Sequence, residues 1–282
     1  MRIHRLFRIA AIGLALSVSA YGEEEKLKPG ELVAKHLASI GNAEALSAVR
    51  NRVAEGKTQV VFRLGAHGQL NGPTTAVSEG QKVYIGMMFP ALDYRSDQLV
   101  YDGRNVTVSQ LSPGRRSQLG VIVHQNDFLL KEGLLGGAMT TAWALLDVAG
   151  RQPKLNYTGL KKAEGKRAHE LRYKARKGGG DFQIALYFDP ETFRHLQTTY
   201  RLVIPEAMAS RPEASSGQQR TIVTLQERFS DFAAVDALIL PHSYMLILTI
   251  EGQSGSSITE WNFHADRILH NQTVDPSAFA LK

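Results

Sequence analysis

The sequence predicts a mainly β protein of the α+β class: a highly curved antiparallel sheet, or half-open barrel, with helices covering its concave face. The first observation is an alternation of apolar and polar residues, which recurs in about eleven short segments that end in Gly, Pro, Asn or Asp. The second is a helical block that interrupts the alternation, because helices beside an antiparallel sheet bury their apolar sides on one of its faces.

The predicted helices lie in two blocks. Residues 30–49 carry a helical apolar stripe that Gly41-Asn42 divides, and residues 116–148 are rich in apolar residues without strict alternation. In the second block we expect one or two helices, with breaks at Gly133 and at Gly136-Gly137.

The predicted strands flank this second block on both sides. Hairpin turns are expected at 177–181 and 252–256, and 206–218 has the composition of a long polar loop. No linker divides the chain into domains. The strands are expected at 59–64, 83–89, 99–101, 106–108, 155–161, 167–175, 182–188, 196–204, 221–232, 240–252 and 257–268.

The start of the chain has the order of an export signal. Three arginines precede an apolar run at 9–20, and small residues at Ala20 and Gly22 come just before an acidic run. A membrane-spanning helix needs about 20 apolar residues, so the run is short for an uncleaved anchor, which is the alternative. We therefore expect a signal peptide at 1–22, one domain at 23–282 and a periplasmic protein. The chain has no cysteine and so forms no disulfide.

The charge of the chain argues against a nucleic-acid partner. Lys and Arg total 33 and Asp and Glu total 27, and three of the arginines lie in the predicted signal, so the remaining excess is small and spread out. The densest basic cluster, at 161–177, is interpreted as a solvated strand face that resists aggregation. A contact with anionic lipid headgroups or an acidic partner is the alternative.

No sequence motif indicates catalysis. The Gly-x-Ser-x-Gly elbow, the zincin histidine pair, the phosphate-binding loop and the dinucleotide fingerprint are all missing from the sequence. His264 and Asp266 would share a strand face, but no third metal ligand is indicated and both are interpreted as surface residues. We therefore expect a protein that is not an enzyme and uses no cofactor or metal; a hydrolase with an unrecognised site is the alternative.

Three stretches have a distinctive order of residues. Residues 82–85 lead to Phe89-Pro90, Asp102-Gly103 joins two apolar runs, and 188–190 precedes 193–196. They resemble segments of the bacterial periplasmic lipoprotein-carrier (outer-membrane lipoprotein-sorting) superfamily. The resemblance implies a half-barrel around an apolar ligand space. In those carriers an arginine commonly precedes the proline and holds a helical lid closed, whereas here Phe89 occupies that position.

These observations predict an exported binding protein that shields a lipid or acyl chain in an apolar cavity, as a lipid or lipoprotein carrier does. Shielding stabilises each methylene group by about 0.8 kcal/mol. The alternatives are an envelope-stress sensor with a membrane-protein partner and a protein-binding scaffold. We expect a monomer that binds a lipid or lipoprotein acyl chain and no nucleic acid. The residues expected to line the cavity are Phe62, Leu64, Val83, Ile85, Met87, Phe89, Val106, Val108, Leu119, Ile122, Trp143, Leu186 and Phe188.

Overall fold

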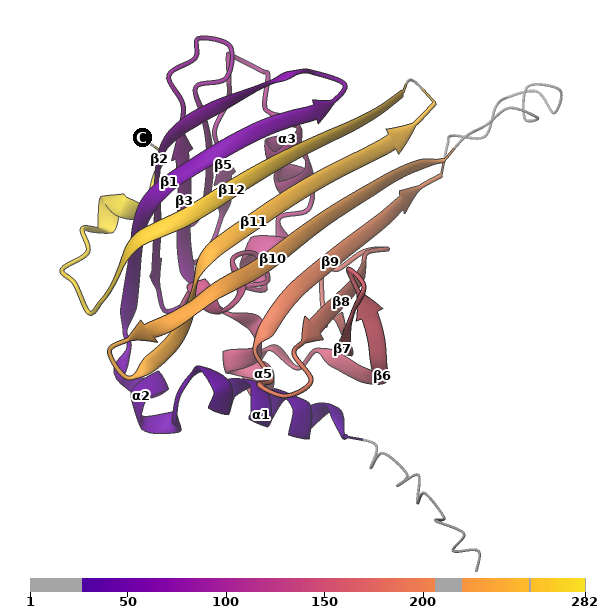
Figure 1. Cartoon of the computed structure of the whole chain (residues 1–282). Coiled ribbons are helices and arrows are strands. Elements are labelled where there is room, and N and C mark those ends of the chain that lie inside the picture. Colours follow the sequence, from indigo (N-terminus) through magenta and orange to yellow (C-terminus); the bar gives the residue numbers. More distant parts are fainter. Residues whose placement is uncertain (1–26, 206–219, 254, 282) are drawn as a thin grey trace, which may run out of the picture.

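The computed structural model describes residues 27–205, 220–253 and 255–281. The predicted signal peptide at 1–22, the predicted loop at 206–218 and one residue of the predicted turn at 252–256 lie outside these ranges. Within them, twelve strands form one strongly curved, unclosed antiparallel sheet in the order β5-β4-β3-β2-β1-β12-β11-β10-β9-β8-β7-β6 (Figure 1). The predicted fold class is therefore confirmed.

Eleven of the strands correspond to predicted ones, and β2 is the strand that the alternation does not predict. Its first half contains Gly, Asn and Pro, which are typical of turns, and it forms because β1 and β3 supply hydrogen-bond partners on both sides. The strands are β1 (Asn51–Leu64), β2 (Gly68–Glu79), β3 (Lys82–Met88), β4 (Ser96–Tyr101), β5 (Val106–Val108), β6 (Lys154–Ala163), β7 (Lys166–Lys174), β8 (Gln183–Phe188), β9 (His195–Ile204), β10 (Thr221–Val235), β11 (Leu238–Gly252) and β12 (Gly255–His270).

The helices are short. In the described part of the chain, none is long and apolar enough to cross a membrane. The predicted first block is two helices, α1 (Pro29–Ile40) and α2 (Ala43–Ala48), and Asn42 caps the second of them.

The second block, expected to hold one or two helices, is instead a series of short pieces. Gly133 and Gly136 interrupt it because both adopt left-handed backbone angles, with φ of 64° and 83°. The pieces are α3 (Gln118–Gln125), α4 (Phe128–Lys131), η1 (Gly137–Met139), η2 (Ala144–Asp147) and α5 (Val148–Arg151). We call residues 109–153 the insert.

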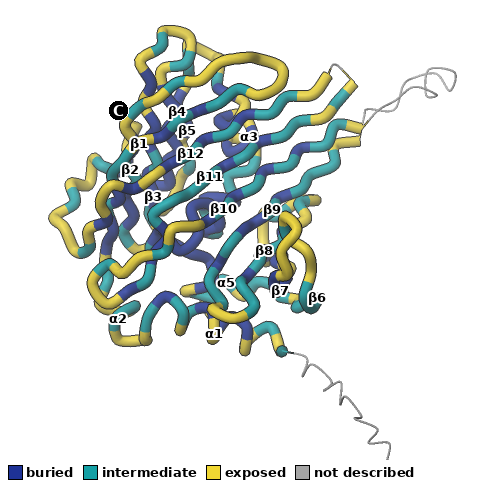
Figure 2. Tube along the Cα trace, in the orientation of Figure 1, coloured by how far each residue is buried: buried dark blue, intermediate teal, exposed yellow. Residues whose placement is uncertain are grey.

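The insert connects the two edges of the sheet. It leaves β5, the strand at one edge, and ends at β6, the strand at the other. It crosses on the concave side, where its central part, residues 133–145, is almost entirely buried (Figure 2). The helix α1 lies across one open end of the half-barrel, and its buried residues Leu32, Val33 and Ile40 join the same core as the insert.

The convex side carries a smaller apolar cluster. There the short helix η4 (Pro276–Phe279) places Phe279 against Val77, Tyr84 and Val100 of the sheet. The last residues of the chain therefore shield strands β2 to β4 from solvent on the face opposite the insert.

A register shift between Glu55 and Gly56 interrupts the pairing of β1 with β12 at the middle of the sheet. Such a bulge increases the local bend of a strand. A Cβ atom on Gly56 would lie 1.9 Å from the carbonyl oxygen of His264, so only glycine allows the two backbones to approach this closely.

We expect Gly56→Ala to lower the free energy of unfolding by about 1–3 kcal/mol, because the new methyl group must push β12 away from β1. Urea denaturation followed by circular dichroism measures the change. Gly30→Ala is the matched control, since a Cβ atom there meets no atom within 4 Å and the position is helical. Equal stability of the two variants would contradict this account of the bulge.

Candidate functional site

The predicted cavity residues from the sheet and from the insert meet in one apolar core. Phe62, Ile85 and Val106 are partly buried against it. The fully buried members are Val83, Met87, Phe89, Val108, Leu186 and Phe188 from the sheet side, and Leu119, Ile122 and Trp143 from the insert. That these residues line a ligand stays a prediction.

Leu64 is the exception, and the expectation that it points into the core is wrong. Its side chain is 44% exposed. It is the last residue of β1, next to a register shift between Phe62 and Leu64. The strand therefore ends at the rim of the sheet, outside the core.

The space between the sheet and the insert is closely packed around Ile85 and Met87. The cavity that these two residues line with Met139 and Phe263 has a volume of about 20 Å³. A single water molecule needs roughly 10–15 Å³ on the same measure, so this space is far smaller than an acyl chain. In this arrangement the insert itself occupies the concave face.

A buried carboxylate of the sheet forms a hydrogen bond with the backbone of the insert. Glu227 on β10 is fully buried and accepts hydrogen bonds from Tyr200 Oη at 2.5 Å and Tyr244 Oη at 2.7 Å. Its third donor is the backbone N–H of Gly136 in the insert, at 2.7 Å. Burial raises the pKa of Glu227 to about 7, although the three hydrogen bonds oppose the rise.

A buried histidine links α1 to the insert and to the turn between β8 and β9. His36 Nε2 accepts a hydrogen bond from Trp143 Nε1 at 3.0 Å, and its Nδ1 lies 3.1 Å from the carbonyl oxygen of Phe193. The ring is therefore neutral, with the proton on Nδ1. Burial lowers the pKa of His36 to about 4. His195 stacks on Trp143, with 4.8 Å between ring centroids, and also lies beside His36.

A second buried carboxylate fixes the start of the insert. Asp97 on β4 accepts hydrogen bonds from Tyr94 Oη, Ser117 Oγ and, at 3.1 Å, Trp261 Nε1. Ser117 also caps α3 by accepting from the backbone N–H of Gly120. Burial raises the pKa of Asp97, against the effect of these donors. Asp97 thus joins β4, β12 and the first helix of the insert.

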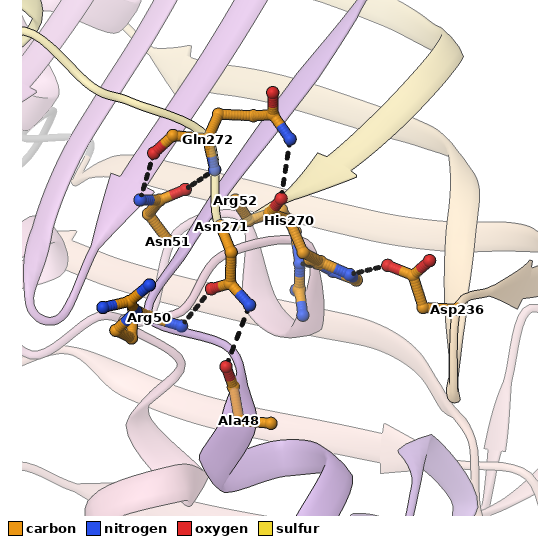
Figure 3. Close-up of polar contacts among 8 residues, drawn as sticks. All are labelled: Ala48, Arg50, Asn51, Arg52, Asp236, His270, Asn271 and Gln272. Atoms are coloured by element: carbon orange, nitrogen blue, oxygen red, sulfur yellow. Dashed lines mark hydrogen bonds and ion pairs between the residues drawn. The ribbon is translucent and has the colours of Figure 1, made fainter.

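Polar side chains also tie the first strand to the last one (Figure 3). Asn51 donates to the carbonyl oxygen of Gln272 at 2.8 Å and accepts from its backbone N–H at 2.9 Å. Asn271 accepts from the backbone N–H of Arg50 and donates to the carbonyl oxygen of Ala48. These contacts fix the start of β1 against the end of β12.

Arg52, near the start of β1, connects β12 to the insert by hydrogen bonds. Its Nη1 donates to the carbonyl oxygen of Ala138 at 2.5 Å, and its Nε donates to His270 Nε2 at 3.0 Å. His270 in turn contacts Asp236 through Nδ1 at 2.7 Å (Figure 3). An arginine does bind the helical insert in this protein, but it comes from β1 and not from the position before Pro90.

A pocket opens at the other end of β1, between the sheet and the first residues of the insert. We call it the mouth pocket. It has a volume of about 290 Å³, and Leu64 contributes to its wall. Arg116 also lines it, and the buried Nε of Arg116 has no hydrogen-bond partner in the described part of the chain. The remaining lining residues include Phe62, Tyr94, Leu111, Arg115, Ser117, Gln118, Thr259 and Trp261.

The polar residues of the core are the ones that the sequence prediction misses. Glu227 stands between Leu225 and Phe229 on the apolar side of its strand, and Asp97 shares a strand side with Leu99. A charged residue on the apolar side of an alternating strand is the signal that points to such a buried group. Its partners cannot be read from the sequence, because they come from distant strands and from the insert.

The described part of the chain offers no centre for metal chemistry. In those ranges no three His, Cys, Asp or Glu side chains are placed to hold a metal ion. His264, considered above as a weak ligand, lies instead 3.2 Å from Ser243 Oγ and 3.8 Å from Asp231 on the surface.

No protein-family model and no curated protein sequence matches this chain. Solved structures are similar to it in fold. A LolA superfamily protein from Nitrosomonas europaea is 11% identical, with a TM-score of 0.48, over 90% of this chain and 98% of its own. A DUF1329 family protein from Desulfovibrio piger is 11% identical, with a TM-score of 0.44, over 89% and 97% of the two chains. A domain assigned to outer membrane lipoprotein sorting, from Vibrio parahaemolyticus, is 11% identical, with a TM-score of 0.44, over 88% and 97%.

We expect the buried carboxylate Glu227 to make stability fall as pH rises from about 4.5 to 7. Its pKa is higher in the folded chain than in the unfolded one, so the folded state binds more protons in this window. The loss amounts to about 3 kcal/mol, because the pKa of Glu227 rises from the ordinary value of 4.5 to about 7. His36 acts in the opposite sense between pH 4 and 6.5, since its pKa is lowered.

A difference experiment isolates the effect of Glu227. The free energy of unfolding is measured against pH for the wild type and for Glu227→Gln, which keeps the shape but cannot ionise. The difference between the two curves should change across pH 4.5–7, while Glu251→Gln at an exposed position of β11 leaves the curve of the wild type unchanged. Parallel curves for wild type and Glu227→Gln would contradict the raised pKa.

Proposed function

We propose that this protein is an exported binding protein for a lipid or acyl chain. We further propose that the ligand binds first at the mouth pocket. The observation that carries the proposal is the combination of apolar walls with a cationic side chain that has a free donor. Leu64 and Phe62 offer apolar surface, and the buried Nε of Arg116 has no acceptor among the described residues. A ligand with an acyl tail and an anionic headgroup satisfies both requirements.

Size and position support the same proposal. A volume of about 290 Å³ is close to the lower limit of small-molecule sites, roughly 300 Å³, which suits one end of an acyl chain better than a whole lipid. Arg115 is exposed at the pocket, so a headgroup has a second cation within reach while it remains in contact with water. No catalytic step is proposed for this site.

The interior of the half-barrel is a second stage in this proposal. Val83, Ile85, Met87 and Leu186 become the walls of a longer channel only when the insert moves off the concave face. That movement must break the hydrogen bond between Glu227 and Gly136 and expose apolar surface, so it is costly without a ligand. The mouth pocket therefore holds the ligand while the insert is in place.

The proposed setting is the bacterial periplasm, with the chain working as a monomer after removal of residues 1–22. The support is the order of charged, apolar and small residues in that segment and the lack of cysteine. An acyl chain that crosses an aqueous compartment needs a protein shield, which gives such a binding protein its role as a carrier.

We expect Leu64→Asp to weaken binding of a fluorescent fatty acid by about 10-fold or more, because a carboxylate in the apolar wall repels both the tail and the headgroup. Binding is measured by titration of the probe. Native mass spectrometry of wild-type protein from an envelope fraction should show a retained lipid.

The matched control is Leu281→Asp. Leu281 is 42% exposed, against 44% for Leu64, and lies near the end of the chain away from the mouth pocket. The Leu281→Asp variant should bind the probe like the wild type. Circular dichroism should show that the wild type and both variants are folded. Equal affinity of the Leu64 and Leu281 variants, or a wild type that binds neither probe nor lipid, would reject the proposed function.

A further inference from the structure

A second pocket lies at the opposite end of β1, between the N-terminal helices, the insert and the sheet. Its volume is about 380 Å³. At the rise of an extended strand, Arg52 and Phe62 are about 30 Å apart, so this pocket is separate from the mouth pocket. We call it the Arg52 pocket. Its main lining residues are Leu37, Leu46, Val49, Arg52, Leu146 and Leu238.

Among the described residues, Arg52 is a buried cation with no carboxylate paired to it. Only 5% of the residue is exposed, and its hydrogen bonds within the described chain go to a neutral carbonyl and a neutral imidazole. Burial lowers the pKa of Arg52 to about 10 and no carboxylate offsets this effect, yet the group remains charged at neutral pH. A buried charge is costly unless it is paired.

The other polar groups of the pocket are already engaged. Thr141 Oγ1 donates to the carbonyl oxygen of Gly80, and Ser47 Oγ donates to that of Glu44. Arg52 is the one charged side chain among the described residues that line the pocket. The pocket therefore combines a single positive charge with apolar walls.

The guanidinium is held in position before any ligand arrives. His270 accepts from Arg52 Nε and donates through Nδ1 to Asp236, which makes the imidazole neutral. Asp236 is exposed in the turn between β10 and β11. It contacts His270 and not the guanidinium of Arg52, and it does not line the pocket. Less ordering is needed when a ligand binds a side chain that is already fixed.

We propose that the Arg52 pocket is a binding site for a single-chain carboxylate, such as a fatty acid, whose carboxylate pairs with Arg52 and whose tail lies along Leu46, Leu146 and Leu238. A guanidinium matches the planar geometry of a carboxylate better than any other side chain does. The volume suits one unbranched chain and not a diacyl lipid. This site does not depend on the proposed function of the mouth pocket.

The test compares two probes with the same tail and opposite charges, decanoate and decyltrimethylammonium, by isothermal titration calorimetry below their micelle concentrations. The wild type should bind decanoate about 10-fold more tightly or better, and Arg52→Met should remove this preference. Arg50→Met is the matched control, because Arg50 is exposed two residues away and should leave the preference intact.

A second variant covers the case in which Arg52→Met does not fold. Leu146 is 38% exposed, so Leu146→Glu should fold and should still weaken decanoate binding about 10-fold by placing a carboxylate at the pocket. Decanoate affinity that is lost in Leu64→Asp but unchanged in Leu146→Glu would overturn this site and support the mouth pocket alone. Equal affinity of the wild type for both probes would also overturn it.

Discussion

The path of the insert determines most of this structure. Strands β5 and β6 stand at opposite edges of the sheet, and the chain between them must cross from one edge to the other. It crosses over the concave face, where a curved sheet leaves its largest apolar surface. The connection thus becomes the cover of the core, and its side chains occupy the space that a ligand would otherwise fill. Trp143, buried against both His36 and His195, shows how fully that space is used.

Hydrogen bonds to buried ionisable groups, and not apolar packing alone, fix the position of the insert on the sheet. Glu227 holds Gly136, Arg52 holds Ala138, and Asp97 holds Ser117, so three points along the insert each meet a buried ionisable group of the sheet. Buried ionisable groups rarely add net stability, because desolvation offsets their contacts. They do penalise every other position of the insert, since displacement would leave a buried charge or carbonyl without a partner.

Alternation predicts the sheet well because burial on one face acts on every strand in the same way. It fails for β2, whose Gly72 and Pro73 suit turns, since the pairing with β1 and β3 outweighs local preference there. Alternation also identifies which side of a strand is apolar, but not how far the cover extends. Leu64 is on the apolar side and is nevertheless exposed, because at the end of β1 the first residues of the insert leave an open pocket and do not cover the strand.

The candidate site was harder to predict than the fold, for a physical reason. A cavity depends on the volume left between layers, and small differences in the path of residues 109–153 decide whether that volume is filled. The sequence shows that Ile85 and Met87 face the insert, but not that Met139 fills the space before them. Likewise, Arg52 precedes the predicted strand 59–64, so the sequence does not indicate that it is buried, and its neutral acceptors come from η1 and β12.

The same insert lines both pockets, which constrains how they influence one another. Arg116 and Ser117 at its start line the mouth pocket, and Thr141 and Leu146 near its end line the Arg52 pocket. One ligand changes the affinity for another only if it prefers one of two positions of a shared element. While the insert stays packed on the sheet, it has one position, so the two pockets act independently. A ligand that enters far enough to displace the insert would remove Arg52 from Ala138 and alter both pockets together.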